Sequence, residues 1–172
     1  MGKMFVIGDT HFGHKNIIEY CARPFTSVKA MDEGMIWAWN KVVSPEDIVY
    51  HLGDFALCDK RRIRQILGQL NGHKYLILGN HDHASKEWYL KNGFEKVYDK
   101  PVLLQKMHIV LSHKPIPDDD LEATGVINIH GHTHDQPADP KEFYPQWHLN
   151  ASAEVIGYRP VEIGRRRSEQ TA

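Results

Sequence analysis

The sequence predicts an α/β fold, and two observations lead to this prediction. Short apolar runs end abruptly in Gly, Asp, Asn or His, as buried strands do when they deliver polar groups at their carboxyl ends. Helical patterns lie between these runs through the first half of the chain, so strand and helix alternate as in crossover units around a largely parallel sheet. Ligands of such sheets collect at the carboxyl ends of the strands.

Three strands are predicted in the first half, and each ends in polar residues. The apolar runs at residues 4–7, 48–50 and 75–78 lead into the segments GDTH, HLGD and GNHD. Helical spacing predicts helices between and after these strands, at residues 16–21, 27–43, 59–70 and 85–92. Asp59 is the expected N-cap of the third helix.

The second half of the chain changes to strands without long helices. Strands are predicted at residues 96–98, 102–105, 107–112, 126–130 and, in one or two pieces, 146–163. We interpret these strands as a second sheet. One domain is expected over residues 1–164, followed by a flexible tail at residues 165–172.

Composition excludes several classes of protein. The 172 residues contain 21 Lys and Arg against 22 Asp and Glu, so the net charge favours neither nucleic acid nor an anionic membrane as a partner. No segment approaches the length of a membrane span, and the N-terminus lacks the pattern of a signal peptide. The cysteines Cys21 and Cys58 match no metal or redox spacing, which predicts reduced thiols in a cytoplasmic protein.

The chain contains 12 histidines, and many adjoin Asp, Asn or Gly at the predicted strand ends. Asp9 and His11 are two residues apart on a segment predicted to be extended, so both side chains would face one ion. Asp54 follows the next strand, and its two oxygens could bridge two cations. Each pair taken alone is more often a turn.

The segment Gly79-Asn80-His81-Asp82 is more informative. Asn80 would supply a neutral oxygen ligand, which leaves His81 free for acid-base or electrostatic work. Asp82 would then hold and polarise the His81 imidazole. The alternative is a simple turn after the strand.

Two further strand ends complete the candidate metal site. His113 ends an apolar run, although a single His in such a place is more often structural. His132 and His134 are two residues apart on a segment predicted to be extended, behind Gly131, which permits close approach. Five such elements, each at a predicted strand end, favour a shared site over coincidence.

The ordered run GDTH, GD, GNHD, SH and GHTH resembles the calcineurin-like metallophosphoesterase superfamily. The resemblance implies the metallophosphatase fold, a four-layer α/β/β/α sandwich of two mixed sheets flanked by helices. It also implies His81 as the catalytic histidine with Asp82 behind it. The implied ligands are, for the first metal, Asp9, His11, Asp54 and His134 and, for the second, Asp54, Asn80, His113 and His132.

The chain looks most similar to the short, single-domain members found in bacteria and phages. It shares their GDTHFGHKNI opening and an Asn-x-Ser-x-Glu ending, here Asn150 to Glu154. Many relatives carry a substrate-contacting Arg after the second Gly-Asp, where this chain has Phe55. Arg61 or Arg62 could take that role, although a solvated helix face is the simpler interpretation.

These observations predict a metal-dependent phosphoesterase, which hydrolyses a phosphate ester with a hydroxide that bridges two divalent metals. Nitrogen and oxygen donors without thiolate suit Mn, Fe, Zn, Ni or Co, and we favour Mn. The chain has no obvious capping domain, so an open site slightly favours a phosphodiesterase. The alternatives are a phosphomonoesterase, a nuclease acting on a nucleotide or nucleic acid, and a non-catalytic metal-binding scaffold on the same fold.

Overall fold

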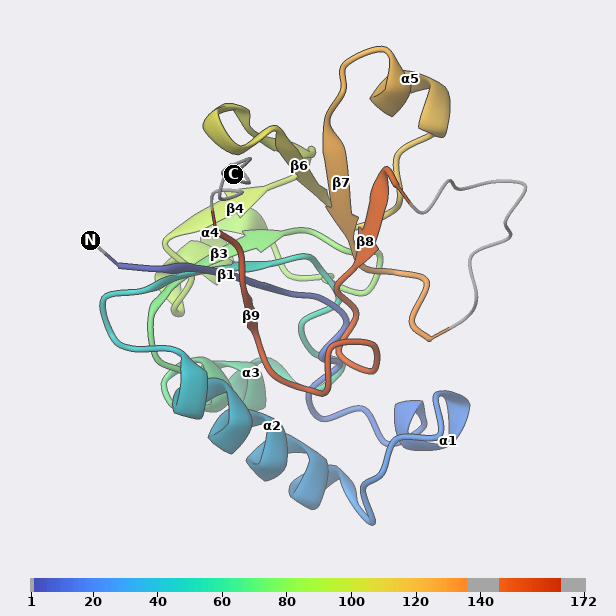
Figure 1. The fold of residues 1–172 in the computed structure, drawn as a ribbon. Helices are drawn as coiled ribbons and strands as arrows, with labels where there is room; N and C mark the ends of the chain where they lie inside the picture. Colours follow the sequence, from blue (N-terminus) through green and yellow to red (C-terminus); the bar gives the residue numbers. More distant parts are fainter. Residues whose placement is uncertain (1, 136–145, 165–172) are drawn as a thin grey trace, which may run out of the picture.

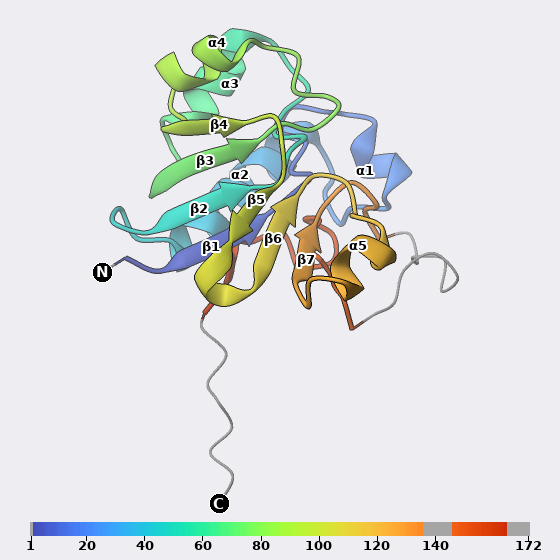
Figure 2. The same ribbon diagram turned by 90° about the horizontal axis from the view of Figure 1, so that it is seen from above.

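A computed structural model describes residues 2–135 and 146–164, so the predicted tail at residues 165–172 lies outside the described residues. Two mixed sheets pack face to face (Figure 1, Figure 2). The first has the order β4-β3-β2-β1-β9 and the second the order β5-β6-β7-β8. The first sheet consists of β1 (Met4–Ile7), β2 (Ile48–His51), β3 (His73–Ile77), β4 (Lys96–Tyr98) and β9 (Val161–Glu162). The second consists of β5 (Val102–Leu104), β6 (Ile109–Ser112), β7 (Ile127–His130) and β8 (His148–Asn150).

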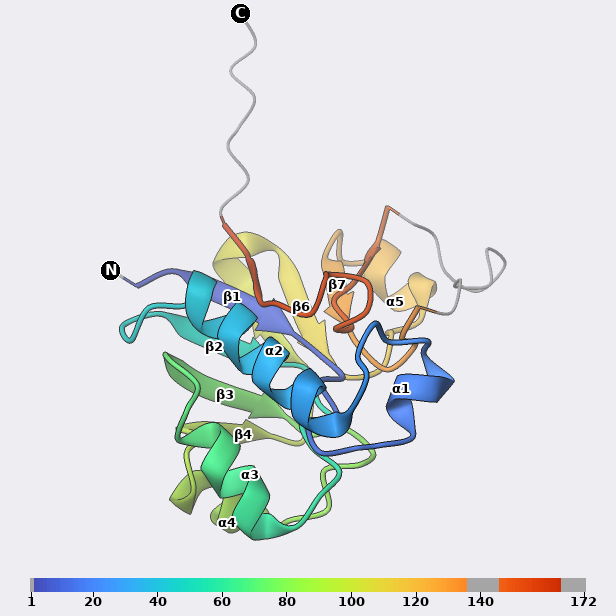
Figure 3. The same ribbon diagram turned by 90° about the horizontal axis from the view of Figure 1, so that it is seen from below.

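Helices flank the sheets, which confirms the predicted α/β class. Figure 3 shows the long helix α2 and helix α3 on the face of the first sheet that is turned away from the second. Ser27, Asp59 and Ser85 cap α2, α3 and α4 by accepting hydrogen bonds from backbone N–H groups, as predicted for Asp59. The helices are α1 (Ile17–Tyr20), α2 (Val28–Val42), α3 (Lys60–Leu67), α4 (Lys86–Lys91), α5 (Asp118–Glu122) and the 3-10 helix η1 (Gln105–Met107).

Alternate residues of the first sheet face two different cores. Between the sheet and the helices, one core buries residues of β1, β2 and β3 against α2 and α3; it includes Phe5, Ile7, Val49, Leu76, Met31, Met35, Trp39, Ile63 and Ile66. The other core lies between the two sheets and includes Val6, Tyr50, Ile77, Leu111 and Ile129. Both faces of the central strands are therefore covered, which explains why the sequence shows them as continuous apolar runs.

The assignment of all later strands to the second sheet is wrong for two of them. β4 pairs in parallel with β3 and β9 pairs antiparallel with β1, so both belong to the first sheet. A strand pattern indicates which faces of a segment are buried, but the partner strand is chosen by the path of the whole chain. The short helix α5 was also not predicted, because its sequence DDDLE has too few apolar residues to show a helical period.

The parallel strands bring their carboxyl ends to one region of the molecule. β1, β2 and β3 are parallel neighbours, as are β6 and β7 in the facing sheet. The backbone N–H of Gly8, just after β1, donates to the carbonyl of Ala151, just after β8, at 2.8 Å. The loops after these strands therefore meet where the two sheets join. None of the helices within residues 2–135 and 146–164 is long and apolar enough to cross a membrane.

Candidate metal centre

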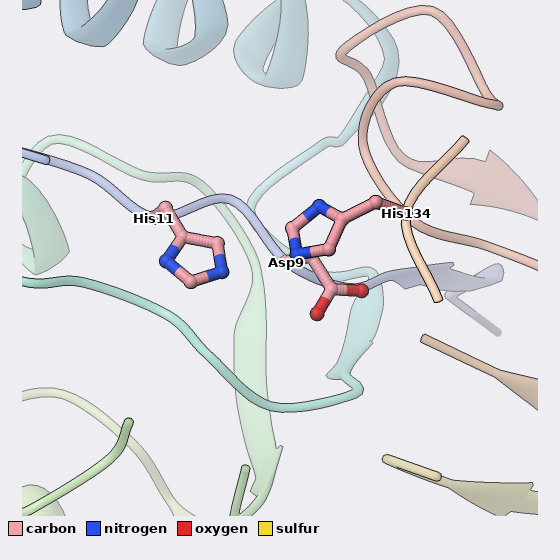
Figure 4. A group of neighbouring side chains, drawn as sticks. All are labelled: Asp9, His11 and His134. Carbon is pink, nitrogen blue, oxygen red and sulfur yellow. The ribbon is translucent and has the colours of Figure 1, made fainter. Parts of the chain in front are cut away.

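The structure brings together all seven residues that the sequence analysis proposed as ligands. They form two groups, and within each group the His nitrogens and carboxylate oxygens lie within 4.8 Å of one another. Asn80 joins the second group, because its Oδ1 is 2.9 Å from Nε2 of His113. The first group is Asp9, His11 and His134 (Figure 4), and the second is Asp54, His113 and His132. Their role as ligands remains a prediction.

Asp54, a member of the second group, is buried and also lies beside His11 of the first group. Its Oδ2 is 3.6 Å from Nε2 of His11, in the first group, and 3.7 Å from Nε2 of His113, in the second. Its Oδ1 accepts a hydrogen bond of 2.8 Å from the backbone N–H of His81. One oxygen therefore fixes the loop after β3, and the other, Oδ2, lies near both groups, whereas the sequence analysis expected each oxygen to bind a different cation.

Asp9 and His11 bury polar atoms that have no hydrogen-bond partner. Asp9 accepts a hydrogen bond at Oδ2 from the backbone N–H of His132, at 2.8 Å, whereas Oδ1 has no hydrogen-bond partner. Burial raises the pKa of Asp9 to about 6, against the opposing effect of His113 and His134. Both ring nitrogens of His11 also lack hydrogen bonds, and burial, together with His134 and Arg23, lowers its pKa to about 2. A buried carboxylate beside a neutral imidazole fits a divalent cation, which would supply the missing partner.

The second group shows the same preference for a cation. Nδ1 of His113 is 2.8 Å from the carbonyl oxygen of Leu52, and because a carbonyl only accepts, Nδ1 carries the proton. Nε2 of the same ring lies 2.9 Å from Oδ1 of Asn80 and 3.2 Å from Nδ1 of His132. Burial and the neighbouring His113 lower the pKa of His132. Nitrogen and oxygen atoms that can bind a cation thus converge in this group.

The backbone at the centre differs from the extended segments that the sequence analysis predicted for Asp9-x-His11 and His132-x-His134. Five ligand candidates have left-handed backbone conformations: Asp9 (φ 53°), His11 (φ 47°), Asp54 (φ 55°), His132 (φ 70°) and His134 (φ 50°). A left-handed residue other than glycine costs about 1–2 kcal/mol. The side chains therefore converge because tight loops turn them inward, and hydrogen bonds between the loops maintain this strained backbone.

His81 and Asp82 do not form the predicted pair. Nε2 of His81 is 4.0 Å from Oδ2 of Asp54, and 42% of the His81 side chain is exposed, so the ring stands at the open side of the centre. The Asp82 carboxylate binds backbone instead: Oδ2 accepts from the N–H groups of Asp54 and Gly79 at 2.8 Å, and Oδ1 from Phe55 at 3.1 Å. No hydrogen bond joins the side chains of these two described residues. A carboxylate beside a turn binds unpaired backbone N–H groups readily, and here they compete with the imidazole.

Two residues beside the centre received no role in the sequence analysis. Glu154 Oε1 is 3.2 Å from Nδ1 of His134, and Glu154 forms an ion pair with Arg23. Glu154 belongs to the Asn-x-Ser-x-Glu ending, so this motif could have identified it as a residue of the site. Arg23 lies in no recognisable pattern, so its contact could come only from the tertiary structure.

Glycine makes the close packing at the centre possible. A Cβ atom on Gly131 would overlap Oδ2 of Asp9, which confirms the close approach predicted for this glycine. A Cβ atom on Gly79 would overlap Oδ1 of Asp54 in the same way.

We expect Gly131→Ala to displace the Asp9 carboxylate and to reduce the metal retained after dialysis, measured by plasma mass spectrometry.

Gly157→Ala is the control for this variant, because Gly157 has a left-handed φ of 72° and no atom within 4 Å of its Cβ position. Both variants should remain folded by circular dichroism, and Gly157→Ala should keep the metal content of the parent protein. If Gly131→Ala also keeps it, the Asp9 carboxylate does not hold metal.

Comparisons with known proteins agree with this geometry. The sequence profile described as calcineurin-like phosphoesterase matches residues 2–162. An uncharacterized protein of Methanocaldococcus jannaschii is 38% identical over 169 residues, which cover 95% of this chain and 88% of that protein. The gene 66 protein of a Mycobacterium phage is 28% identical over 163 residues, covering 78% of each chain.

A solved structure is also similar. The crystal structure of a protein of unknown function from Aquifex aeolicus superposes with a TM-score of 0.72 at 32% sequence identity, covering 94% of this chain and 96% of that one. The shared fold and the match over almost the whole chain support the same conclusion. This protein belongs to the calcineurin-like phosphoesterase family.

Proposed function

We propose that this protein is a phosphodiesterase that works with two divalent cations, with Mn favoured among Mn, Fe, Zn, Ni and Co. The observation that carries the proposal is the Asp54 carboxylate, whose Oδ2 lies 3.6 Å and 3.7 Å from imidazoles of two separate ligand groups. Two bound cations would neutralise the phosphoryl oxygens and lower the pKa of a water molecule toward neutrality. The donors are imidazole nitrogens and carboxylate or amide oxygens, which suit these metals better than Mg or Ca.

His81 is the candidate for the residue that contacts the substrate and donates a hydrogen bond or a proton to it. Its ring stands at the open side of the centre, while its backbone N–H is bound by Asp54. The same aspartate thus links the position of His81 to that of the ligands. From this place, the imidazole would donate a hydrogen bond to a phosphoryl oxygen or a proton to the leaving oxygen.

The ion pairs of Arg23 and Arg62 favour a diester over a monoester. A phosphate monoester carries about one more negative charge than a diester at neutral pH, because its second pKa is about 6. The position at which many relatives have a substrate-contacting Arg is occupied by Phe55, which is fully buried. Arg62 binds the buried Asp32 at 2.9 Å and Arg23 binds Glu154, so these two arginines are already engaged.

The other candidate functions receive less support. A nuclease needs a basic surface for the phosphate backbone, and the chain has equal numbers of acidic and basic residues to within one. A scaffold without turnover is disfavoured by the convergence of every proposed ligand in two groups.

The choice between diester and monoester is tested with bis-p-nitrophenyl phosphate and p-nitrophenyl phosphate, assayed side by side with added Mn, Ni, Zn or Mg. We expect Mn to support turnover, the diester to be the better substrate, and EDTA to abolish both reactions. Asp54→Asn keeps the shape of the bridging residue but removes its charge, so its turnover should fall with every metal. If none of the four metals supports turnover of either substrate, the non-catalytic scaffold is favoured instead.

His81→Ala tests the role of the histidine at the open side. Turnover should fall by about 10²–10⁴-fold, the range typical of an acid-base residue, while the metal content stays unchanged. His83→Ala is the matched control, since His83 is exposed and its ring centroid lies 6.2 Å from that of His81. Loss of metal together with activity in His81→Ala would show that His81 is a ligand.

A further inference from the structure

The buried side chain of Arg23 is hydrogen-bonded to the loop that carries two of the proposed ligands, Asp9 and His11. The Arg23 side chain is fully buried. Its Nη2 donates to the carbonyl of Asp9 at 2.7 Å, and its Nη1 donates to the carbonyl of Thr10 at 2.8 Å. These two bonds hold the strained backbone between Asp9 and His11, both of which have left-handed φ angles.

The partner of this arginine orients the third ligand of the same group. Glu154 Oε1 accepts hydrogen bonds from Nε of Arg23, at 2.8 Å, and from its Nη2. The same oxygen is 3.2 Å from Nδ1 of His134. Figure 4 shows the other ring nitrogen of His134 turned toward the carboxylate of Asp9. A carboxylate at Nδ1 keeps the proton there, so that Nε2 presents a lone pair toward the centre.

The second group is oriented in a different way. His113 is held by the backbone carbonyl of Leu52, and the Asp54 carboxylate is held by the backbone N–H of His81. Arg23 and Glu154 therefore act through Asp9, His11 and His134, the three members of the first group. A buried ion pair by itself contributes little net stability, because desolvation offsets the attraction between the charges. Its contacts here point to a role beyond folding.

We propose that Arg23 and Glu154 are positioning residues that act chiefly on the metal affinity of the first group. The pair fixes the backbone of Asp9 and His11 from one side and the ring of His134 from the other. This inference rests on the proposed two-metal function. It adds that this pair contacts the first group directly, whereas it reaches the second group only indirectly, as through the hydrogen bond from the backbone N–H of His132 to Asp9.

The test is the binding of Mn²⁺ to metal-free protein, followed by isothermal titration calorimetry and by metal content after dialysis. In Glu154→Ala, one of two sites should weaken by about 10–100-fold, the usual cost of losing such a supporting carboxylate, and the other should weaken much less. Glu154→Gln should have a smaller effect, because its amide oxygen can still accept a hydrogen bond from Nδ1 of His134. Glu154→Gln also provides a folded variant if Glu154→Ala does not fold.

Asp32→Asn is the matched control. Asp32 is a buried carboxylate that accepts hydrogen bonds of 2.9 Å from the backbone N–H of Gly13 and from Nη2 of Arg62. It thus forms a similar ion pair next to the same loop but contacts no proposed ligand. We expect a lower free energy of unfolding in Asp32→Asn and unchanged affinities at both sites.

Cys21→Ser separates positioning from direct ligation. Sγ of Cys21 lies within 4.8 Å of ligand atoms of His134 and Glu154, so these three residues could themselves hold a cation. The positive charge of Arg23 beside Glu154 opposes this arrangement. Cys21→Ser should therefore leave Mn²⁺ and Zn²⁺ affinity unchanged. A loss equal to that of Glu154→Ala would overturn the positioning role.

Two further outcomes would also overturn it. One is unchanged affinity at both sites in a folded Glu154 variant, and the other is equal weakening of both sites, as a general loosening of the fold would produce. If the proposed two-metal function is itself wrong, the unmodified protein should bind fewer than two Mn²⁺ ions. That result distinguishes this failure from a failure of the positioning role.

Discussion

The candidate metal centre depends on the buried carboxylate of Asp54, whose two oxygens have different partners. Oδ1 binds the backbone of the loop after β3, and Oδ2 lies between imidazoles that come from opposite sheets. Asp9 repeats this division, with one oxygen on the loop after β7 and the other without a hydrogen-bond partner. Two carboxylates buried in this way need positive charge. Arg23, which binds the backbone of Asp9, is already paired with Glu154, so bound cations would supply the remaining charge in the proposed function.

The sequence predicted the strands of the first half, and the region where the proposed ligands converge, for one physical reason. The first sheet is covered on both faces, so its strands appear as apolar runs that stop where the polar loops begin. Polar residues placed directly after a buried strand must lie at the edge of the sheet. The amino-acid pattern alone therefore suffices to assign Asp9, Asp54 and Asn80 to one region of the molecule.

Other features could not be predicted, because they depend on contacts between distant parts of the chain. The pairing of β9 with β1 joins residues more than 150 positions apart. The left-handed backbone at His132 and His134 depends on contacts such as the hydrogen bond from His132 to Asp9. The contacts of the Asp82 side chain could not be predicted for the same reason. Its neighbour in sequence is His81, but three backbone N–H groups lie closer to its oxygens.

The most direct test of the account is X-ray diffraction from crystals of the Mn²⁺-loaded protein, collected at the manganese absorption edge. Two anomalous peaks should appear, about 3.5–4 Å apart, with the Asp54 carboxylate between them. Asp9, His11 and His134 should surround one peak, and Asn80, His113 and His132 the other. A single peak, or two peaks that do not share Asp54, would contradict the account.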